Sequence, residues 1–540
     1  MRHVRRLSAL LRRRLVDGRL PPEVRASLID LIRLRMLVPV ADRISALRPV
    51  PRGGGGRRAR LGTRRLVVTG PVDSSFHHAG IETAGQVSQW LGEAGIGHFL
   101  TGREGDRLVF GVELGRRRDL ARALLDRSPD GEWYVEWERG SRSGIVALRG
   151  RRRSAELALS MATEWAVFEA RSMGEIAVGP ESAAVIRFWE IGTSGMCELV
   201  GERGQARFDP RSPAENQQIG DRTFPGRAAF PVDHSFETFD EPVDIVITWV
   251  DGSDPEWQRE FSRWAHTEGR DVDRDHGLTT GRYRSRDELR YALRSIWYHC
   301  GWVRRVFVVT SGQRPSWLVE DERLRLVPHN EILPDDALPT FNSHAIESAL
   351  HRIDGLAEHF IYLNDDMFIG RPVRPELFFT PNGLPRVFSS TSRVPGFEDD
   401  SYLAYDTASR RGRELLDETF GRVVSTKPMH APYPQRRSTG AELEDRYPEI
   451  MDRTAHSRFR HRDDLSVAAS FALHYGLATE RAVVGGLDAE YAHLESARLE
   501  WLLDRLLLGR QAQAFCLNET EQVGDQEHID RLVGNFLEAY

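Results

Sequence analysis

Four short apolar runs between residues 244 and 366 end abruptly in polar residues. The runs are 244–250, 306–310, 324–327 and 360–363, and the polar residues that follow are Asp251, Ser311-Gly312, His329-Asn330 and Asn364-Asp365-Asp366. Segments 287–297 and 343–353 lie between them and place apolar residues at helical spacing. Strands that alternate with helices favour a mostly parallel sheet. The pattern therefore predicts an α/β fold with a Rossmann-like sheet whose strands all end at one rim.

The chain after residue 366 predicts a mainly helical C-terminal part. Apolar residues at helical spacing favour helices over 441–453, 463–476, 489–509 and 526–540, whereas residues 515–519 fit a short strand or a loop. Residues 376–424 are typical of loops. Residues 427–434 contain three prolines and predict a fixed loop that exposes His430.

Residues 61–240 predict an accessory α+β domain of unknown role. Strand-like runs at 66–69, 108–114, 133–137 and 183–189 are interspersed with helical patterns at 84–95 and 116–127. None of these segments carries a chemical motif. A glycine-rich linker at 51–58 follows a basic segment that is helical or disordered. We therefore divide the chain into residues 1–60, an accessory domain at 61–240 and a catalytic domain at 241–540.

Charge is distributed unevenly along the chain. The net charge is −6, but residues 1–70 contain 18 arginines and 4 acids, so +14 at this end leaves −20 for the remainder. A basic end attracts anionic lipid, although a solvated tail explains the same residues equally well. We expect peripheral contact of residues 1–60 with the inner face of the plasma membrane, and no nucleic-acid partner.

Hydropathy and cysteine usage favour a cytoplasmic protein. No apolar run reaches the roughly 18 residues of a transmembrane helix, and the first residues lack the apolar core and cleavage site of a secretory signal. The three cysteines, Cys197, Cys300 and Cys516, follow no CxxC pattern. This spacing argues against disulfides and against a zinc site.

Acidic residues follow two of the expected strands. Asp251 and Asp254 lie three residues apart in a turn, and Asp365 and Asp366 follow the run at 360–363. Ligands of open α/β sheets bind beyond the carboxyl ends of the strands, and Mg²⁺ or Mn²⁺ prefers carboxylate oxygens. The sequence therefore predicts a site for one of these ions, formed by either pair of acids.

Residues suited to phosphoryl transfer occur further along the chain. This chemistry needs a base for the nucleophile and cations that neutralise the phosphates. An imidazole titrates near neutral pH, so His430 suits the base. Arg460, with Lys427 or Arg458, suits the phosphate oxygens, and Lys427 is the only lysine of the chain.

Each of these residues also has a plain structural explanation. Two acids after a strand often form only a turn or a helix cap. A histidine in a proline-rich loop is often a surface residue, and the arginines at 458, 460 and 462 also fit a solvated face. Asn342 and Ser343 fit an ordinary cap of the helix at 343–353. Spacing alone leaves both explanations open.

Four blocks within residues 242–540 resemble the Stealth family. The blocks are 244–257; 286–296 with 339–347 and 362–366; Lys427 through His430 to Arg460 and 463–465; and 515–519 with the following helix. The family includes bacterial capsular-polysaccharide phosphotransferases and the catalytic subunit of the animal lysosomal-enzyme N-acetylglucosamine-1-phosphotransferase. It has Asn or Asp at the position of Asp251, so a metal role for Asp251 does not follow from the resemblance.

The resemblance implies transfer of a sugar 1-phosphate, such as HexNAc-1-phosphate, from a UDP-sugar to a glycan hydroxyl. UMP is released, and the product is a capsule or other surface polysaccharide. The alternative is a conventional UDP-sugar glycosyltransferase that releases UDP. Motifs and resemblance together predict catalytic roles for His430, Arg460 and Asp366, and a metal site at Asp365 and Asp366. The donor-binding residues that we predict are Asp244, Asp251, Asn342, Ser343, Glu347 and Lys427.

Overall fold

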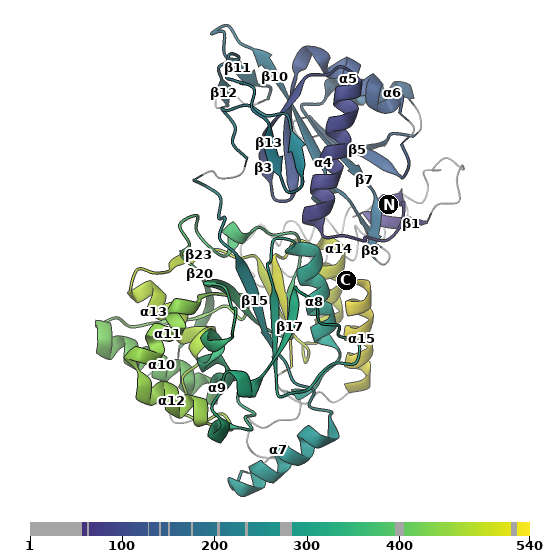
Figure 1. Cartoon of the computed structure of the whole chain (residues 1–540). Coiled ribbons are helices and arrows are strands. Elements are labelled where there is room, and N and C mark those ends of the chain that lie inside the picture. Colours follow the sequence, from purple (N-terminus) through teal and green to yellow (C-terminus); the bar gives the residue numbers. More distant parts are fainter. Residues whose placement is uncertain are drawn as a thin grey trace, which may run out of the picture.

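The structure is a computed structural model that describes residues 57–540, apart from 62–63, 128, 140–141, 150–151, 174–175, 202–205, 233–235, 271–282, 395–403 and 520–525. Figure 1 shows two lobes, an upper one that contains β1 to β14 and a lower one that contains β15 to β25. The expected membrane contact of residues 1–60 lies almost entirely outside the described residues. Within the described ranges, no helix is long and apolar enough to cross a membrane.

The upper lobe packs three helices against an eight-stranded mixed sheet and a smaller four-stranded one. The helices are α4 (Phe76–Glu93), α5 (Arg117–Leu125) and α6 (Arg152–Met161). The strands are β1 (Arg58–Leu61), β2 (Arg64–Val67), β3 (His98–Glu104), β4 (Arg107–Glu113), β5 (Trp133–Arg139), β6 (Arg142–Ala147), β7 (Glu164–Glu169), β8 (Arg171–Met173), β9 (Ile176–Val178), β10 (Ala184–Ile191), β11 (Cys197–Leu199), β12 (Arg207–Phe208), β13 (Gln217–Ile219) and β14 (Arg222–Phe224). α4 begins at Phe76 rather than near 84 because the Ser75 hydroxyl accepts a hydrogen bond from the backbone N–H of His78 at 3.1 Å and caps the helix.

The lower lobe is built around a five-stranded sheet in the order β17-β16-β15-β18-β22. Its strands are β15 (Val243–Thr248), β16 (Val306–Thr310), β17 (Leu324–Pro328), β18 (His359–Asn364) and β22 (Tyr433–Arg436). The first four run parallel, and β22 is antiparallel to β18. The chain adds β16 and β17 on one side of β15 and then returns to add β18 on the other. In α/β sheets, the crevice at such a reversal is where ligands bind.

Two smaller sheets and two groups of helices surround this sheet. The strands are β19 (Met367–Ile369), β20 (Arg386–Arg393), β21 (Thr426–Pro428), β23 (Val483–Gly485), β24 (Ala489–His493) and β25 (Ala514–Asn518). The helices are α7 (Pro255–Thr267), α8 (Glu288–His299), α9 (Ser343–Ser348), α10 (Ala404–Phe420), α11 (Arg437–Arg446), α12 (Pro448–His456), a π-helix (Val467–Phe471), α13 (Ala472–Ala478), α14 (Leu499–Gly509) and α15 (Gln526–Ala539). Figure 1 shows the sheet between the group α10 to α13 and the group α8 and α15.

The predicted α/β class and the four strands that precede the polar residues are confirmed, and their ends shift by at most two residues. Several predictions for the C-terminal part were wrong. Residues 489–493 form β24 because they pair with β25, and the helix predicted to begin there starts only at Leu499. The region 376–424 contains α10, whose Leu415 and Leu416 pack against α12. Contacts between distant segments determine both β24 and α10, and such contacts cannot be predicted from the local sequence pattern.

The segments around His430 and Asp464 also differ from expectation. Residues 427–434 are not a free loop, because β21 and β22 flank a short turn that carries His430. Pro434 is tolerated in β22 because this strand lies at the edge of the sheet. The predicted helix at 463–476 begins only at residue 467, as the π-helix, so Asp464 is not at a helix start. Its carboxylate is buried and accepts hydrogen bonds from Asn342 Nδ2 and the His461 backbone N–H, both at 2.8 Å.

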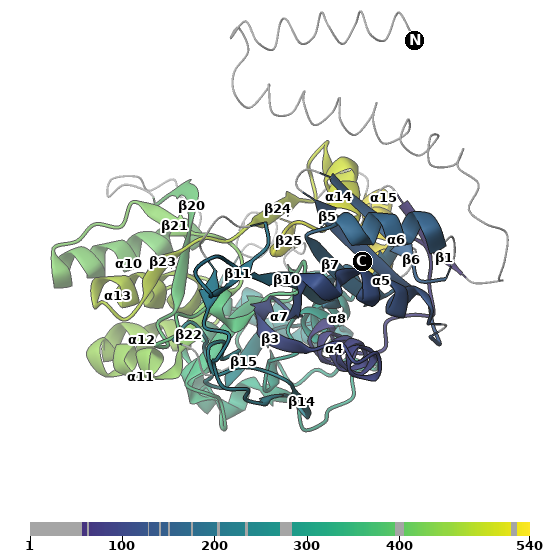
Figure 2. The same cartoon turned by 90° about the horizontal axis from the view of Figure 1, so that it is seen from above.

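The two lobes meet at the end of the sheet where the parallel strands begin. Phe76 of α4 stacks on His299, the last residue of α8, with ring centroids 5.3 Å apart. Arg374 of the lower lobe reaches His77 of the upper lobe at 3.4 Å. Figure 2 shows, from above, that α10 to α13 lie away from α4 and the rest of the upper lobe. α7, which follows the carboxyl end of β15, lies on the side of the lower lobe that points away from the upper lobe (Figure 1), so the upper lobe does not cover this rim.

Asp244 provides a test of the packing at the amino end of β15. Its fully buried carboxylate accepts hydrogen bonds from Arg304 Nε at 2.9 Å and from the Ala357 backbone N–H at 2.7 Å. Asp244→Ala leaves both donors without this acceptor and is expected to lower the free energy of unfolding by about 3 kcal/mol. Asp336→Ala, at a side chain that is 80% exposed, is expected to change it by less than about 0.5 kcal/mol. Urea unfolding measures both, and equal small effects would contradict this structural role.

Candidate active site

A cleft of about 950 Å³ opens at the carboxyl rim of the five-stranded sheet. Its walls come from the ends of β15 and β18, the first turn of α9, the turn between β21 and β22, and strands β24 and β25. The predicted site residues that line it are Ser343, Glu347, Asp365, Asp366, Lys427, His430 and Arg460. The structure thus brings together residues from segments that are more than 100 positions apart in the sequence.

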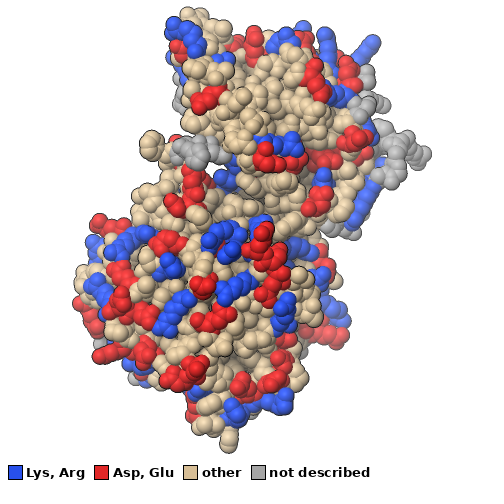
Figure 3. Space-filling model, viewed as in Figure 1, with Lys and Arg blue, Asp and Glu red and all other residues tan. Residues whose placement is uncertain are grey.

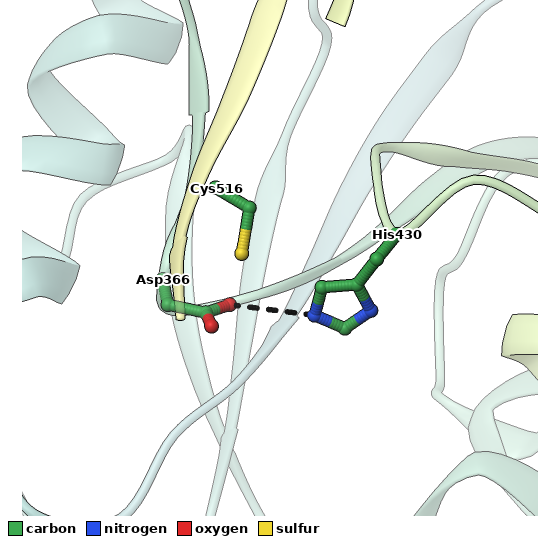
Figure 4. A group of neighbouring side chains, drawn as sticks. All are labelled: Asp366, His430 and Cys516. Atoms are coloured by element: carbon green, nitrogen blue, oxygen red, sulfur yellow. Dashed lines mark ion pairs between the residues drawn. The ribbon is translucent and has the colours of Figure 1, made fainter. Parts of the chain in front are cut away.

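Asp366 and His430 face each other across this cleft. His430 Nε2 lies 4.0 Å from Asp366 Oδ1, and the pair is marked in Figure 4. The other ring nitrogen, Nδ1, lies 3.0 Å from the Tyr433 hydroxyl. Tyr433 pairs with Tyr362 across β22 and β18, and this register holds the turn that carries His430 beside residues 364–366. The contact with Tyr433 therefore orients the His430 ring so that Nε2 faces Asp366.

The C-terminal strand β25 holds Asp366 from the other side. Asn518 Nδ2 donates to Asp366 Oδ2 at 3.2 Å, and the Leu517 backbone N–H donates to the Asp366 carbonyl at 3.0 Å. Cys516 lies next to both Asp366 and His430, with one polar atom of each residue within 4.8 Å of the others. Burial and the Asp366 carboxylate raise the pKa of the Cys516 thiol well above its usual value. Without a bound ion the thiol therefore stays protonated.

Carboxylates crowd the floor of the cleft. Burial raises the pKa of Asp365 well above its usual range, and the nearby charges of Asp366 and Glu288 raise it further. Burial also raises the pKa of Glu288. Arg286 is the main counter-charge, since it forms ion pairs with Glu288 at 3.5 Å and Glu519 at 2.5 Å. A bound divalent cation would relieve the remaining repulsion.

Three oxygen atoms of this floor lack a hydrogen-bond donor among the described residues. They are Asp366 Oδ1, Asn518 Oδ1 and Glu519 Oε1, and all three are buried. Buried oxygen atoms without donors are costly unless another group satisfies them. Carboxylate and amide oxygens are the ligands that Mg²⁺ and Mn²⁺ prefer. The residues present therefore fit such an ion, and Asp365 and Asp366 are the carboxylates predicted to hold it.

Arg460 and Glu347 form the opposite wall of the cleft. Arg460 Nη2 donates to Ser343 Oγ at 2.7 Å, which directs the guanidinium across the start of α9. Glu347 Oε2 accepts a hydrogen bond from the Ala469 backbone N–H at 3.1 Å. Burial raises the pKa of the Glu347 carboxyl. Lys427 lines the same cleft, so the cleft combines a cationic wall with an acidic floor.

The structure places four strand-end or cap residues outside the cleft. Asp244, predicted as a donor contact, lies at the amino end of β15, where it pairs with Arg304. Asp251 Oδ1 accepts from Ser253 N at 2.8 Å, and Asp254 caps α7 through the Glu256 N–H at 2.9 Å. The carboxylates of these three acids therefore accept hydrogen bonds that stabilise local structure. Of the two acidic pairs predicted as a metal site, only Asp365 and Asp366 line the cleft.

Asn342 is the fourth residue that does not line the cleft. It is fully buried, and its Oδ1 accepts a hydrogen bond from the His344 N–H at 3.0 Å. Asn342, rather than Ser343, is thus the N-cap of α9. The cap leaves the Ser343 hydroxyl available to Arg460, so Asn342 acts on the cleft by positioning its neighbour.

Sequence reasoning missed several residues of the cleft. They are Glu288, Arg286, Tyr433, Asn518 and Glu519. Asn518 and Glu519 follow the apolar run 514–517, which is the same pattern that identified residues 364–366. That signal was present in the sequence. Tyr433 carried no such signal, because only the pairing of β22 with β18 brings it to His430.

The buried Glu347 carboxyl makes stability depend on pH in a defined direction. Its pKa is raised in the folded protein, whereas an unfolded glutamate titrates at about 4.3. Between these values the folded protein binds more protons, so its free energy of unfolding falls as pH rises. Glu347→Gln removes this loss, and the variant is expected to gain stability relative to wild type between about pH 5 and pH 8.

Urea unfolding of wild type and Glu347→Gln at about pH 5 and at about pH 8 measures this difference in stability. Glu527→Gln is the matched control, because the Glu527 side chain is 85% exposed, and it is expected to show no such trend. A stability difference between Glu347→Gln and wild type that is the same at both pH values would contradict the expectation.

Comparison with known proteins agrees with the geometry of the site. Three segments match the conserved regions of Stealth proteins: residues 241–265 match region 1, 282–387 match region 2 and 429–477 match region 3. An exopolysaccharide phosphotransferase of Streptomyces coelicolor is 38% identical over 94% of this chain and 85% of its own length. The exopolysaccharide phosphotransferase CpsY of Mycobacterium leprae is 33% identical over 86% of each chain. The protein therefore belongs to the Stealth family and is a phosphotransferase of polysaccharide synthesis.

Proposed function

We propose that the enzyme transfers a sugar 1-phosphate, such as HexNAc-1-phosphate, from a UDP-sugar to a glycan hydroxyl. The observation that carries this proposal is the facing pair of His430 and Asp366 in the same cleft as the Arg460–Ser343 contact. The phosphotransferase names of the relatives support it at the level of reaction class. The sheet order, with its reversal at β15, also supports a Rossmann-like nucleotide site at this rim.

In the proposed reaction, the acceptor oxygen attacks the phosphorus that carries the sugar. A new oxygen–phosphorus bond forms, and the bond to the bridging oxygen between the two phosphates breaks. That oxygen leaves with UMP. The acceptor proton passes to His430 Nε2, which faces the cleft floor, whereas Nδ1 is engaged by Tyr433. We therefore propose His430 as the general base.

Charge on the donor meets complementary groups in the cleft. We propose that Arg460, which donates a hydrogen bond to Ser343 Oγ, binds phosphate oxygens, because a guanidinium can hold such oxygens through two parallel hydrogen bonds. Mg²⁺ or Mn²⁺, when bound by Asp365 and Asp366, would neutralise charge on the pyrophosphate. Buried oxygen atoms of Asn518 and Glu519 suit the remaining ligand positions.

The competing function is that of a glycosyltransferase. In that reaction the acceptor attacks the sugar carbon rather than phosphorus, and UDP leaves. Acids at strand ends and a divalent cation serve both reactions. The two functions therefore differ in the nucleotide product.

We expect UMP, not UDP, when the purified protein turns over a UDP-sugar with a glycan acceptor and Mg²⁺. Mass spectrometry of the nucleotide fraction identifies the product, and a panel of UDP-sugars and acceptor glycans covers the unknown specificity. A mixture without acceptor controls for plain hydrolysis. UDP formed in a one-to-one ratio with the glycan product would instead establish the glycosyltransferase.

Asp366→Asn is expected to abolish most of the activity while the fold is kept. The change removes one charge from the cleft floor and weakens the placement of the ion and of His430, so we expect kcat to fall at least about a hundredfold, or about 3 kcal/mol. Asp254→Asn is the matched control, because it alters an acid outside the cleft that caps α7. Steady-state kinetics and circular dichroism compare both variants. If Asp366→Asn stays within about threefold of wild type, the carboxylate is structural.

A further inference from the structure

A thiol lies against the facing pair of Asp366 and His430. It belongs to Cys516, the third residue of β25, which is fully buried beside the cleft-lining residues Leu517 and Asn518. Asp366, His430 and Cys516 each bring one metal-ligating atom within 4.8 Å of the other two (Figure 4). The three residues are more than 60 positions apart in the sequence. Cysteine spacing, which records only ligands that are close along the chain, therefore gave no sign of this trio.

The three side chains of the trio suit Zn²⁺. A cysteine sulfur, a histidine nitrogen and a carboxylate oxygen are its usual ligands, and sulfur favours it over Mg²⁺ and Mn²⁺. The ligand atoms of a tetrahedral zinc site lie roughly 3.3–3.6 Å apart, given bonds of about 2.0–2.3 Å. His430 Nε2 and Asp366 Oδ1 are 4.0 Å apart without an ion. The three atoms therefore need to close by only on the order of 1 Å to share one ion.

Neighbouring residues orient two of the three ligands as a metal site requires. A metal-bound histidine usually forms a hydrogen bond through its other ring nitrogen, and a metal-bound carboxylate is itself hydrogen-bonded. His430 Nδ1 lies 3.0 Å from the Tyr433 hydroxyl, and Asp366 Oδ2 accepts a hydrogen bond from Asn518 Nδ2 at 3.2 Å. The remaining atoms of these side chains, Nε2 and Oδ1, face each other. The surroundings of the trio are thus those of a metal site.

One ligand atom of the trio also needs a positively charged partner. Asp366 Oδ1 is buried and has no hydrogen-bond donor among the described residues. Such an oxygen is costly to bury, and a bound cation removes that cost. Asp366 and His430 line the cleft, so an ion can reach them from there, whereas the Cys516 sulfur closes the inner side. Water from the cleft can complete a four-coordinate site.

We propose that Asp366, His430 and Cys516 form an inhibitory site for Zn²⁺. The ion bonds to His430 Nε2, to one oxygen of Asp366 and to the Cys516 sulfur, and the thiol proton passes to solvent. The inhibition rests on the proposed function, in which Nε2 takes the acceptor proton and Asp366 holds Mg²⁺ or Mn²⁺. Zinc at the trio occupies both groups, so it stops turnover. The buried thiol thus makes the enzyme sensitive to which divalent cation is present.

Binding at the trio differs from binding at the surface through its sulfur ligand. Figure 3 shows acidic side chains interspersed with basic ones over the lower lobe, and exposed acids and histidines offer zinc further weak sites without sulfur. Cys516→Ser removes the sulfur of the trio and nearly keeps the volume of the side chain. Cys300→Ser is the matched control, because Cys300 is also buried but follows α8 at the end that faces the upper lobe.

Metal titration of the full chain tests the site directly. Co²⁺ replaces zinc as a visible probe, since its bond to a cysteine sulfur gives an intense near-ultraviolet charge-transfer band. Competition with the chelator mag-fura-2 gives the affinity for Zn²⁺. Wild type and Cys300→Ser should show the cobalt band. Cys516→Ser should lose it and bind Zn²⁺ at least about tenfold more weakly, because even the loss of an outer partner of a metal site costs this much.

The inference is overturned if the wild type shows no cobalt band, if Cys516→Ser keeps it, or if both variants bind Zn²⁺ equally. X-ray absorption spectroscopy of the zinc-loaded wild type needs no variant, so it decides the matter if Cys516→Ser fails to fold by circular dichroism. We expect one sulfur at about 2.3 Å from zinc, with the other ligand atoms at about 2.0–2.2 Å. A zinc shell of nitrogen and oxygen alone would contradict the site.

A turnover assay connects the site to inhibition. Each protein is compared with its own rate of UMP release in Mg²⁺ without zinc. Cys516→Ser should need at least about tenfold more free Zn²⁺ than wild type and Cys300→Ser for the same fractional loss of rate, and equal sensitivity would refute the inhibitory role.

The two measurements separate this inference from the proposed function. If the wild type forms UMP but binds Co²⁺ without the sulfur band, only the inference fails. If the metals bind through Cys516 but no protein forms UMP, the proposed function fails, and the metal site stands without the inhibitory role assigned to it.

Discussion

The active site depends on one pairing, that of the short antiparallel strand β22 with β18. Tyr433 lies opposite Tyr362 in this pairing, and both rings are buried and stacked with centroids 5.9 Å apart. β18 ends two residues after Tyr362, at Asn364, and the acids of the cleft floor follow directly. His430 lies three residues before Tyr433. A slip by one residue would turn Tyr433 to the other face of the sheet. His430 would then lose its Nδ1 partner and its position opposite Asp366.

The electrostatics of the cleft follow from this arrangement. Asp365 and Asp366 follow the end of β18, and Asn518 ends β25, so these three residues lie on one side of the cleft. Glu347 of α9 and Arg460 of the segment after α12 lie on the other side. Burial raises the pKa of Asp365, and repulsion from the charges of Asp366 and Glu288 raises it further. In the proposed reaction, this floor would repel a pyrophosphate unless a cation were bound there, whereas Arg460 would supply positive charge that does not depend on a cation.

The sequence predicted the site residues at the strand ends better than those that other segments bring to the cleft. Residues 364–366 were identifiable because an apolar run ends there, and strand ends of parallel sheets meet at one edge. Asp244, which the resemblance implied as a donor contact, begins the run 244–250 rather than ending it, and its carboxylate pairs with Arg304 at the opposite edge of the sheet. Asn518 carried the strand-end signal but was not selected. Tyr433, β24 and α10 were not predictable locally, because partners far along the chain determine their place.

The upper lobe acts on the site through a helix rather than by covering it. α8 has Glu288 in its first turn, on the cleft floor, and His299 at its end, stacked on Phe76 of the upper lobe. The contact between the lobes therefore lies at the end of this 12-residue helix that is opposite to Glu288. Arg286, just before α8, is tied to Glu519 and Asp530, and this pins the C-terminal segment to the same helix. The upper lobe thus leaves the carboxyl rim uncovered and contacts the far end of α8, while the C-terminal segment holds the start of the same helix.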